Sequence, residues 1–158
     1  MNHEIHDSRR NGFTLLEMMI ALAITMLLAV AGIGFYRNFS KSVELDATAR
    51  NMIADLRNAR VKAMGGEDQM KWGIRFRNGT PDDDYQLFST PTNYASASTS
   101  IKDTTILKGG IAFTSPSSGN NTDVIFDRVY GSTTPATVSI ASENNSKTIT
   151  ITALGTIY

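Results

Sequence analysis

The 158-residue chain carries 15 Lys and Arg residues against 15 Asp and Glu residues, and it contains no cysteine. This length permits one domain plus an anchor, and the balanced charge excludes a strong overall field of the kind that attracts nucleic acid. The lack of cysteine excludes disulfide bonds and thiol chemistry. Both histidines, His3 and His6, lie within the first 12 residues, so a chain cut after residue 12 would contain no histidine to act as a general base.

The chain begins with a polar segment, residues 1–12, which contains the basic pair Arg9 and Arg10. An apolar run, residues 13–36, follows, and its only charged side chain is Glu17. As a helix this run spans roughly 36 Å, enough to cross a hydrocarbon core of about 30 Å. We therefore expect a single membrane span, and the basic pair predicts a cytoplasmic N-terminus with the rest of the chain outside the membrane.

Glu17 is the unusual residue of this span. A carboxylate in a lipid-facing segment costs several kcal/mol unless it is neutralised or paired. It lies four residues after Phe13 and therefore on the same helix face. A cut before Phe13 would create a new ammonium group one helical turn away from the carboxylate.

The polar leader, Gly12 and the following Phe13-Thr14-Leu15-Leu16-Glu17 resemble the signal of type IV prepilins, shared by type IV pilins and by secretion and competence pseudopilins. The resemblance implies cleavage between Gly12 and Phe13 by the prepilin peptidase, and N-methylation of Phe13. It also implies that Glu17 pairs with the terminal amine of a neighbouring subunit. A secretory signal peptide fits less well, because its apolar core is usually about 7–15 residues long.

By the same resemblance, the partners would be other pilins or pseudopilins in a hetero-oligomeric filament, the prepilin peptidase and an inner-membrane assembly platform. The protein would cross the bacterial inner membrane once and enter a pilus or pseudopilus. Its C-terminal domain would lie in the periplasm or outside the cell.

The helical pattern continues beyond the apolar run to Met64, and Gly65-Gly66 then favours a helix end. Apolar residues recur there at steps of three and four, with charged residues largely between them; they are Phe39, Val43, Ala47, Ala49, Met52, Ile53, Leu56, Ala59 and Ala63. We predict one helix over residues 13–64. Its 13–36 half would suit lipid and neighbouring helices, and its amphipathic 37–64 half would cover the chain's own domain.

After residue 64 the apolar period changes to two, which indicates strands. Strands are expected over 70–77 and 85–88, in short pieces near 106–113 and 124–126, and as a hairpin over 136–140 and 148–152. Ser, Thr and Asn-rich segments at 89–105 and 115–122 predict two exposed loops. If the protein were instead a membrane-anchored adhesin or carbohydrate-binding module, these loops would be its binding surface. The predicted fold is α+β, with the long helix packed on an antiparallel β-sheet domain, residues 65–158.

This order of elements resembles the minor pseudopilin H family and related minor type IV pilins. The similar motifs are Leu56-Arg57-Asn58-Ala59-Arg60, the 72–76 strand, Ile111-Ala112-Phe113, Val124-Ile125-Phe126 with Gly131, and Ile149-Thr150-Ile151 before Leu154-Gly155. The resemblance implies a minor pilin or pseudopilin of a type II secretion pseudopilus or type IV pilus. The sequence does not distinguish secretion, pilus and competence machines.

Other clusters of possible chemistry are weaker. Asp82, Asp83 and Asp84 offer hard oxygen ligands for calcium, but three adjacent carboxylates do not match the spaced ligands of a calcium loop, and a solvated turn is favoured. No other metal or cofactor is predicted. With no histidine after residue 12 and no nucleophile motif, a hydrolase is disfavoured, and we predict a protein that is not an enzyme.

A DNA-uptake subunit is an alternative. Six basic residues could line one side of the domain and contact phosphates; they are Arg57, Arg60, Lys62, Lys71, Arg75 and Arg77. Some related minor pilins bind DNA through basic residues near the C-terminus, but residues 149–158 contain no Lys or Arg here. Nucleic acid is therefore not the expected partner.

Overall fold

The computed structural model describes residues 12–143 and 145–158, without the side chains of residues 32–35. Most of the predicted leader lies outside the described residues. The chain divides into two compact units, Met1–Phe39 and Ser40–Tyr158, and each is considered by itself. In order, the described part forms α1 (Leu15–Met64), the short 3₁₀-helix η1 (Glu67–Gln69), β1 (Lys71–Arg77), β2 (Asp84–Thr90), β3 (Ser100–Ile106), β4 (Ala112–Ser115), β5 (Asn121–Phe126), β6 (Ala136–Ser142) and β7 (Asn145–Ile151).

Helix α1 has 50 residues, which confirms the single long helix. It ends at Met64 as predicted. The Gly65 amide donates a hydrogen bond of 2.8 Å to the carbonyl oxygen of Val61, and Gly66 has a positive φ of 67°. Only glycine adopts that conformation without strain, so the glycine pair ends the helix.

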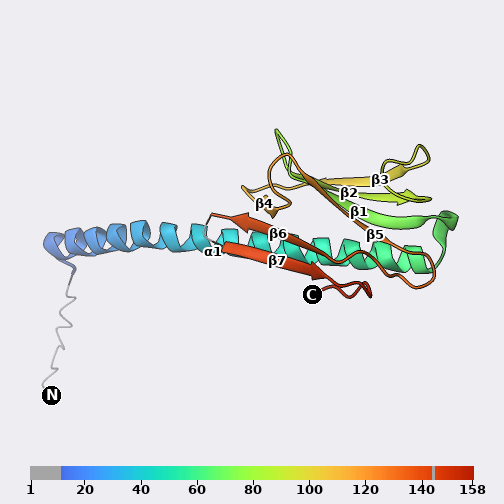
Figure 1. Cartoon of the computed structure of the whole chain (residues 1–158). Helices are drawn as coiled ribbons and strands as arrows, with labels where there is room; N and C mark the ends of the chain where they lie inside the picture. The colour runs from blue at the N-terminus through green and yellow to red at the C-terminus, as the bar shows by residue number, and fades with distance from the viewer. Residues whose placement is uncertain (1–11, 144) are drawn as a thin grey trace, which may run out of the picture. The chain divides into compact units, whose positions relative to one another are not determined.

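The strands form antiparallel pairs throughout, as Figure 1 shows. Within the described residues they make a four-stranded sheet of order β3-β2-β1-β5 and a three-stranded sheet of order β4-β6-β7. The α+β prediction is therefore confirmed, although the strands form two sheets where one was expected. The chain changes sheet three times after β3, and the connections contain glycines with positive φ, namely Gly109, Gly110, Gly119 and Gly131.

The core lies between α1 and the two sheets. A stripe on α1 with spacings of four and three residues is at most 7% exposed; its members are Leu45, Ala49, Met52, Leu56, Ala59 and Ala63. It packs in one cluster with strand residues of both sheets, among them Ile74, Phe76, Val138 and Ile151. Phe39 and Val43, predicted on this face, are 68% and 51% exposed, because at 100° per residue they point away from the face that Leu45 begins.

The predicted loop 89–105 is wrong at both ends, because residues 89–90 belong to β2 and residues 100–105 to β3. Strand β3 pairs with β2 and forms one edge of the four-stranded sheet. Nearly all its side chains are exposed. An exposed edge strand does not need alternating apolar residues. The Lys, Asp and Thr residues of β3 therefore have the composition of a loop, although the segment is a strand.

Candidate functional site

The predicted processing site lies at the start of α1. The backbone amide of Glu17 donates a hydrogen bond to Thr14 Oγ1 at 3.2 Å, and the amide of Met18 donates to the Thr14 carbonyl oxygen at 3.2 Å. Thr14 is therefore the N-cap, and Thr14 and Glu17 stand in the spacing of a capping box. The helix begins at Leu15, two residues later than predicted.

This cap has two consequences for the residues around it. Gly12 and Phe13 stay outside the helix and are exposed, so the peptide bond between them is free of helical hydrogen bonds. Glu17 lies in the first turn, where a carboxylate interacts favourably with the partial positive charge of the helix N-terminus. The sequence motif is thus arranged as an accessible bond followed by a capped helix.

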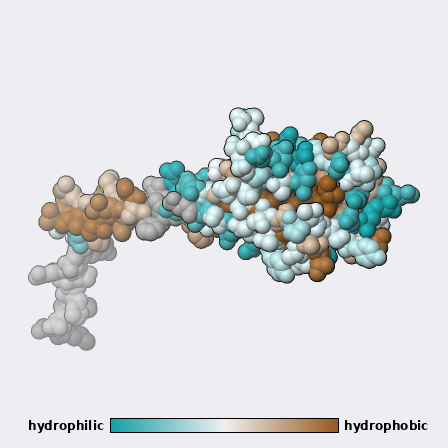
Figure 2. All heavy atoms as spheres, in the orientation of Figure 1, coloured by the Kyte–Doolittle hydropathy of each residue, from teal (hydrophilic) through white to brown (hydrophobic). Residues whose placement is uncertain are grey.

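The first half of α1 exposes its apolar side chains. From Phe13 to Val30 the large apolar residues are between 52% and 79% exposed, and Figure 2 shows them as a continuous apolar surface. The hydroxyl of Thr25 donates to the carbonyl oxygen of Ala21 at 2.7 Å, which satisfies it within the helix. Among the described residues, α1 is the one helix that has the length and composition to cross a membrane.

Glu17 has no ion-pair partner within the described part of this chain. Its carboxylate therefore stands in an apolar, exposed surface without intramolecular neutralisation. Such a group needs a cation from outside the chain when this surface is covered.

Comparison with protein-family models bears on this same segment. A model of the prokaryotic N-terminal methylation motif matches residues 7–33. The chain carries a prepilin-type methylation motif. This motif supports a pilin-like or pseudopilin protein and, with the apolar helix, is consistent with membrane anchoring. No curated protein and no solved structure matches the chain.

The methylation motif includes Gly12, Phe13 and Glu17, the residues identified in the sequence for cleavage, methylation and pairing. It ends before the amphipathic half of α1, so it carries no information on the globular unit. The resemblance to the minor pseudopilin H family remains a prediction.

The three aspartates at 82–84 lie at the turn before β2, but they do not share one role. Asp83 is only 9% exposed, and its carboxylate accepts hydrogen bonds from the amides of Gly79 at 3.0 Å and Phe113 at 2.6 Å. Asp84 is 5% exposed and pairs through both oxygens with Arg77, at 2.8 Å each. The solvated turn predicted here is wrong for these two residues, and Asp82 alone is exposed.

Asp83 and Asp84 are therefore structural. Asp83 connects the β1–β2 turn with β4 of the other sheet, and Asp84 neutralises Arg77 across two strands. No group of three His, Cys, Asp or Glu side chains in the described ranges could hold a metal ion. A cavity of about 490 Å³ lies beside this turn, with Arg77, Asp82 and Thr104 among its lining residues.

Most of the six basic residues considered for DNA contact already bind acidic or carbonyl groups of this chain. Arg75 pairs with Asp123 through two hydrogen bonds of 2.5 and 2.6 Å, and Lys62 and Lys71 pair with Glu67 and Asp127. The hydrogen bonds that Arg75 donates to Asp123 and Arg77 donates to Asp84 raise the pKa of the two arginines above the usual arginine value. Arg60 donates to backbone carbonyl oxygens of Gly131 and Leu154.

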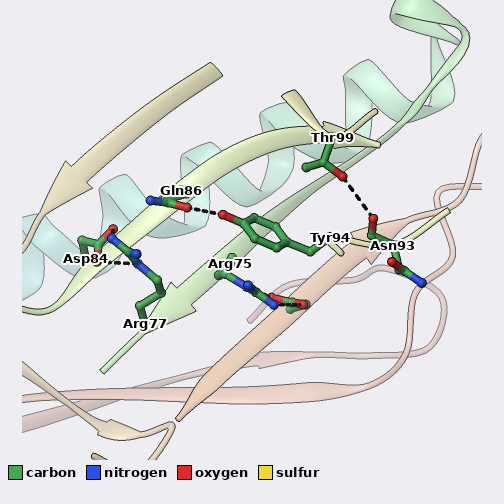
Figure 3. A network of polar contacts seen from close by, with 8 residues as sticks. Arg75, Arg77, Asp84, Gln86, Asn93, Tyr94 and Thr99 are labelled. Atoms are coloured by element: carbon green, nitrogen blue, oxygen red, sulfur yellow. Dashed lines mark hydrogen bonds and ion pairs between the residues drawn. The ribbon is translucent and has the colours of Figure 1, made fainter. Parts of the chain in front are cut away.

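Tyr94 organises a polar network on the outer face of the four-stranded sheet, shown in Figure 3. Its hydroxyl lies 2.7 Å from Gln86 Oε1, the Arg75 guanidinium lies 3.5 Å from the centre of its ring, and Phe88 packs edge-on against it. The 91–99 connection is thus held on the sheet, and β2 is buried on both faces except at Leu87. No sequence pattern indicated this contact, because a single Tyr in a Ser-rich stretch is typical of an exposed loop.

Proposed function

We propose that the protein is a minor pseudopilin or minor pilin, a structural subunit of a type II secretion pseudopilus or a type IV pilus. The observation that carries the proposal is the methylation motif on a helix whose apolar half is exposed and contains one carboxylate without an ion-pair partner among the described residues. A helix of this kind becomes stable when lipid or neighbouring helices cover it. The role is structural and not catalytic.

The proposed sequence of events begins in the inner membrane. The prepilin peptidase cuts the exposed bond between Gly12 and Phe13, and the amine of Phe13 is methylated. The N-terminus before cleavage faces the cytoplasm, because Arg9 and Arg10 precede the span. The globular unit then lies in the periplasm, and the assembly platform adds the processed subunit to the filament.

In the filament, the carboxylate of Glu17 pairs with the terminal ammonium group of a neighbouring subunit. Each charge relieves the desolvation of the other, and removal of one partner leaves a buried unpaired charge, which costs about 3–5 kcal/mol. The similarity of element order to the minor pseudopilin H family and to related minor type IV pilins fits a secretion pseudopilus and a type IV pilus alike. The paired state of most of the basic residues disfavours a DNA-uptake subunit.

Processing is tested by intact-mass measurement of the protein extracted from membranes. We expect a chain that begins at Phe13 and carries one methyl group on its amine. Gly12→Ala should slow or block cleavage, because the added Cβ alters the residue that the peptidase must accept. A chain that still begins at Met1 in cells with an active prepilin peptidase would contradict the proposal.

Pairing is tested by co-purification with the assembled filament, with Glu17→Ala and Glu17→Gln compared with the unchanged protein. Both variants should insert and be cleaved, because removal of the carboxylate favours insertion, but their incorporation should fall. Glu44→Gln removes a carboxylate from the other half of α1 and serves as the matched control. Equal incorporation of all variants from an internal filament position, shown by crosslinks to the major subunit, would end the pairing hypothesis.

A further inference from the structure

The C-terminal end of α1 carries an exposed apolar surface that the proposed function does not use. Val61 and Met64 are 67% and 45% exposed there. Two turns from later in the chain lie beside them, and their residues Val129, Tyr130 and Leu154 are 67%, 79% and 76% exposed. We name the surface formed by Arg57, Val61, Met64, Val129, Tyr130 and Leu154 the helix-end patch.

Contacts within the domain show that these segments adjoin. Arg60 Nη2 donates to the Leu154 carbonyl oxygen at 2.9 Å, and Arg60 Nε donates to the Gly131 carbonyl oxygen at 3.3 Å. A side chain at Gly131 would collide with Met64 at 2.8 Å. Figure 1 accordingly shows the β5–β6 connection passing the C-terminal end of α1.

The helix-end patch contains a cavity, and one wall of this cavity is fixed by the domain core. A cavity of about 340 Å³ is lined by Arg57, Arg60, Val61, Met64, Gly155, Thr156 and Ile157. Its rear wall belongs to the core, because Ile157 is 6% exposed and forms a bridge with Ile151. A surface of this shape can accept one apolar side chain of a partner.

The turn at Val129 is strained, although the Val129 side chain is mostly exposed. Val129 has a φ of 75°, a conformation in which a β-branched residue is a genuine outlier. The Tyr130 amide closes the turn by donating to the Arg128 carbonyl oxygen at 2.9 Å. Glycine would fit there without strain, and the Val129 side chain gains little from burial because it is mostly exposed. Strain retained at an exposed apolar residue points to a contact outside the chain.

The charges around the patch are positive. Arg57 and Arg128 have no ion-pair partner among the described residues, and Asp127, the acidic residue of the same turn, is paired with Lys71 at 2.6 Å. Two copies of the patch facing each other would bring like charges together, so a symmetric pair of this chain is disfavoured. A fluid lipid surface would require neither the cavity nor a turn held in one conformation.

We propose that the helix-end patch docks a partner protein domain, which inserts an apolar side chain into the cavity and places carboxylates against Arg57 and Arg128. The aromatic side chain of Tyr130 is the central contact, as exposed Tyr and Arg residues are at many interfaces. The interaction is separate from assembly through the N-terminal span and does not rest on the proposed function.

The test uses the full chain in its host cells, with the photo-crosslinking residue p-benzoylphenylalanine in place of Tyr130. A second chain carries it at Leu154, and a control chain carries it at Ser98, an exposed residue of the β2–β3 connection. We expect both patch positions to crosslink to one protein, through a peptide that contains apolar and acidic residues. The control position should not give this adduct.

Charge reversal tests the chemistry of the contact. In the chain that crosslinks from position 130, Arg57→Glu with Arg128→Glu should reduce the adduct about tenfold or more, whereas Arg57→Lys with Arg128→Lys should retain most of it. Reversing a carboxylate in the crosslinked peptide of the partner to Lys should restore the adduct of the Glu variant. Val129→Gly should weaken the adduct and leave the resistance of the domain to heat unchanged or higher, which separates docking from folding.

Several results would overturn the proposal. They are a lack of adduct from both patch positions, an equal adduct from the Ser98 position, an adduct with a second copy of this chain or with lipid, and an adduct insensitive to charge reversal. Each variant is checked for N-terminal processing and for resistance to protease, so that loss of the adduct reports on docking. If N-terminal processing failed in the unchanged chain, the proposed function would be contradicted. The crosslinking results would still decide the docking proposal, because docking does not depend on processing.

Discussion

The two halves of α1 differ in what covers them. In the first half, apolar residues occur around the whole helix, and Leu16, Leu22 and Leu28 are 68%, 56% and 68% exposed. In the second half, the buried apolar residues form a single stripe, and Leu45 and Leu56 on that stripe are fully buried. The same residue type on the same helix is therefore exposed in one half and buried in the other.

The two halves differ in exposure because their apolar residues are arranged differently around the helix. A stripe can be covered on one side by the chain's own sheets, whereas an apolar surface around the whole helix requires a surrounding environment. The globular unit thus buries its own stripe, whereas the apolar side chains of the first half of α1 stay exposed among the described residues. Single substitutions can test whether the two halves are as independent as this comparison indicates.

Leu56→Ala should have the largest effect on the globular unit. The side chain is fully buried in the core, and its truncation should lower the free energy of unfolding by about 2–5 kcal/mol. Leu22→Ala is the matched control on the exposed half, and it should leave that free energy within about 0.5 kcal/mol. Denaturant unfolding of the purified full chain in detergent, followed through Trp72 fluorescence, measures both.

The opposite result would contradict the conclusion that the two halves of α1 are independent. If Leu22→Ala destabilised the domain as much as Leu56→Ala, the first half of α1 would contribute to the domain core. A small effect of both would show that the stripe is not tightly packed.

Asp83→Ala should have a smaller but clear effect. It would leave the amides of Gly79 and Phe113 without their acceptor, and a buried donor without a partner costs about 1–3 kcal/mol. Asp82→Ala, which changes the exposed neighbour, should have almost no effect on thermal unfolding. Equal effects of the two substitutions would show that the turn acts as one cluster, as a ligand site would, and stabilisation by added calcium would support that alternative.

Tyr85→Phe should change the response to alkaline pH. Burial of the ring, and then the hydrogen bond of 2.8 Å from its hydroxyl to Asp55 Oδ2, raise the pKa of Tyr85 above its usual value near 10. Because the folded state holds this proton more tightly, the stability it contributes is present below the unfolded pKa and is lost as pH rises above about 10. Urea unfolding at neutral and alkaline pH should show a weaker loss of stability in the Tyr85→Phe protein than in the unchanged protein.

At neutral pH the same substitution should cost about 1.5–3 kcal/mol, the contribution of a hydrogen bond to a charged group. Tyr130→Phe is the control, because that hydroxyl is on a side chain that is 79% exposed. An identical alkaline response of both variants would show that Tyr85 is not the group responsible.

Local patterns in the sequence were sufficient for the helix and for most strands. The change from a period near four to a period of two, across Gly65-Gly66, marks the end of α1 correctly. The hairpin of β6 and β7 follows from alternating apolar and Thr or Ser residues. These features depend on neighbouring residues, and a sequence displays such neighbours directly.

Features that depend on distant residues were not visible. The division into two sheets is made by connections whose direction depends on contacts across the whole domain. The role of Asp83 depends on its contact with Phe113, which lies 30 residues later in the chain. The role of Tyr94 depends on Gln86, which lies eight residues earlier and on another element. At the N-terminal site, the types of Gly12, Phe13 and Glu17 were recognisable, but the hydrogen bond that makes Thr14 the N-cap of the helix required the structure.

The bridge between Ile151 and Ile157 has a consequence for the order of synthesis. The stripe on α1 leaves the ribosome first, but Ile157, which belongs to the same core, is the second-last residue of the chain. Arg60 likewise finds its acceptor at Leu154 only after 94 more residues have been made. Contacts of such long separation form slowly. The apolar stripe is therefore uncovered until these late residues have been made, and in this interval aggregation or a chaperone can intervene.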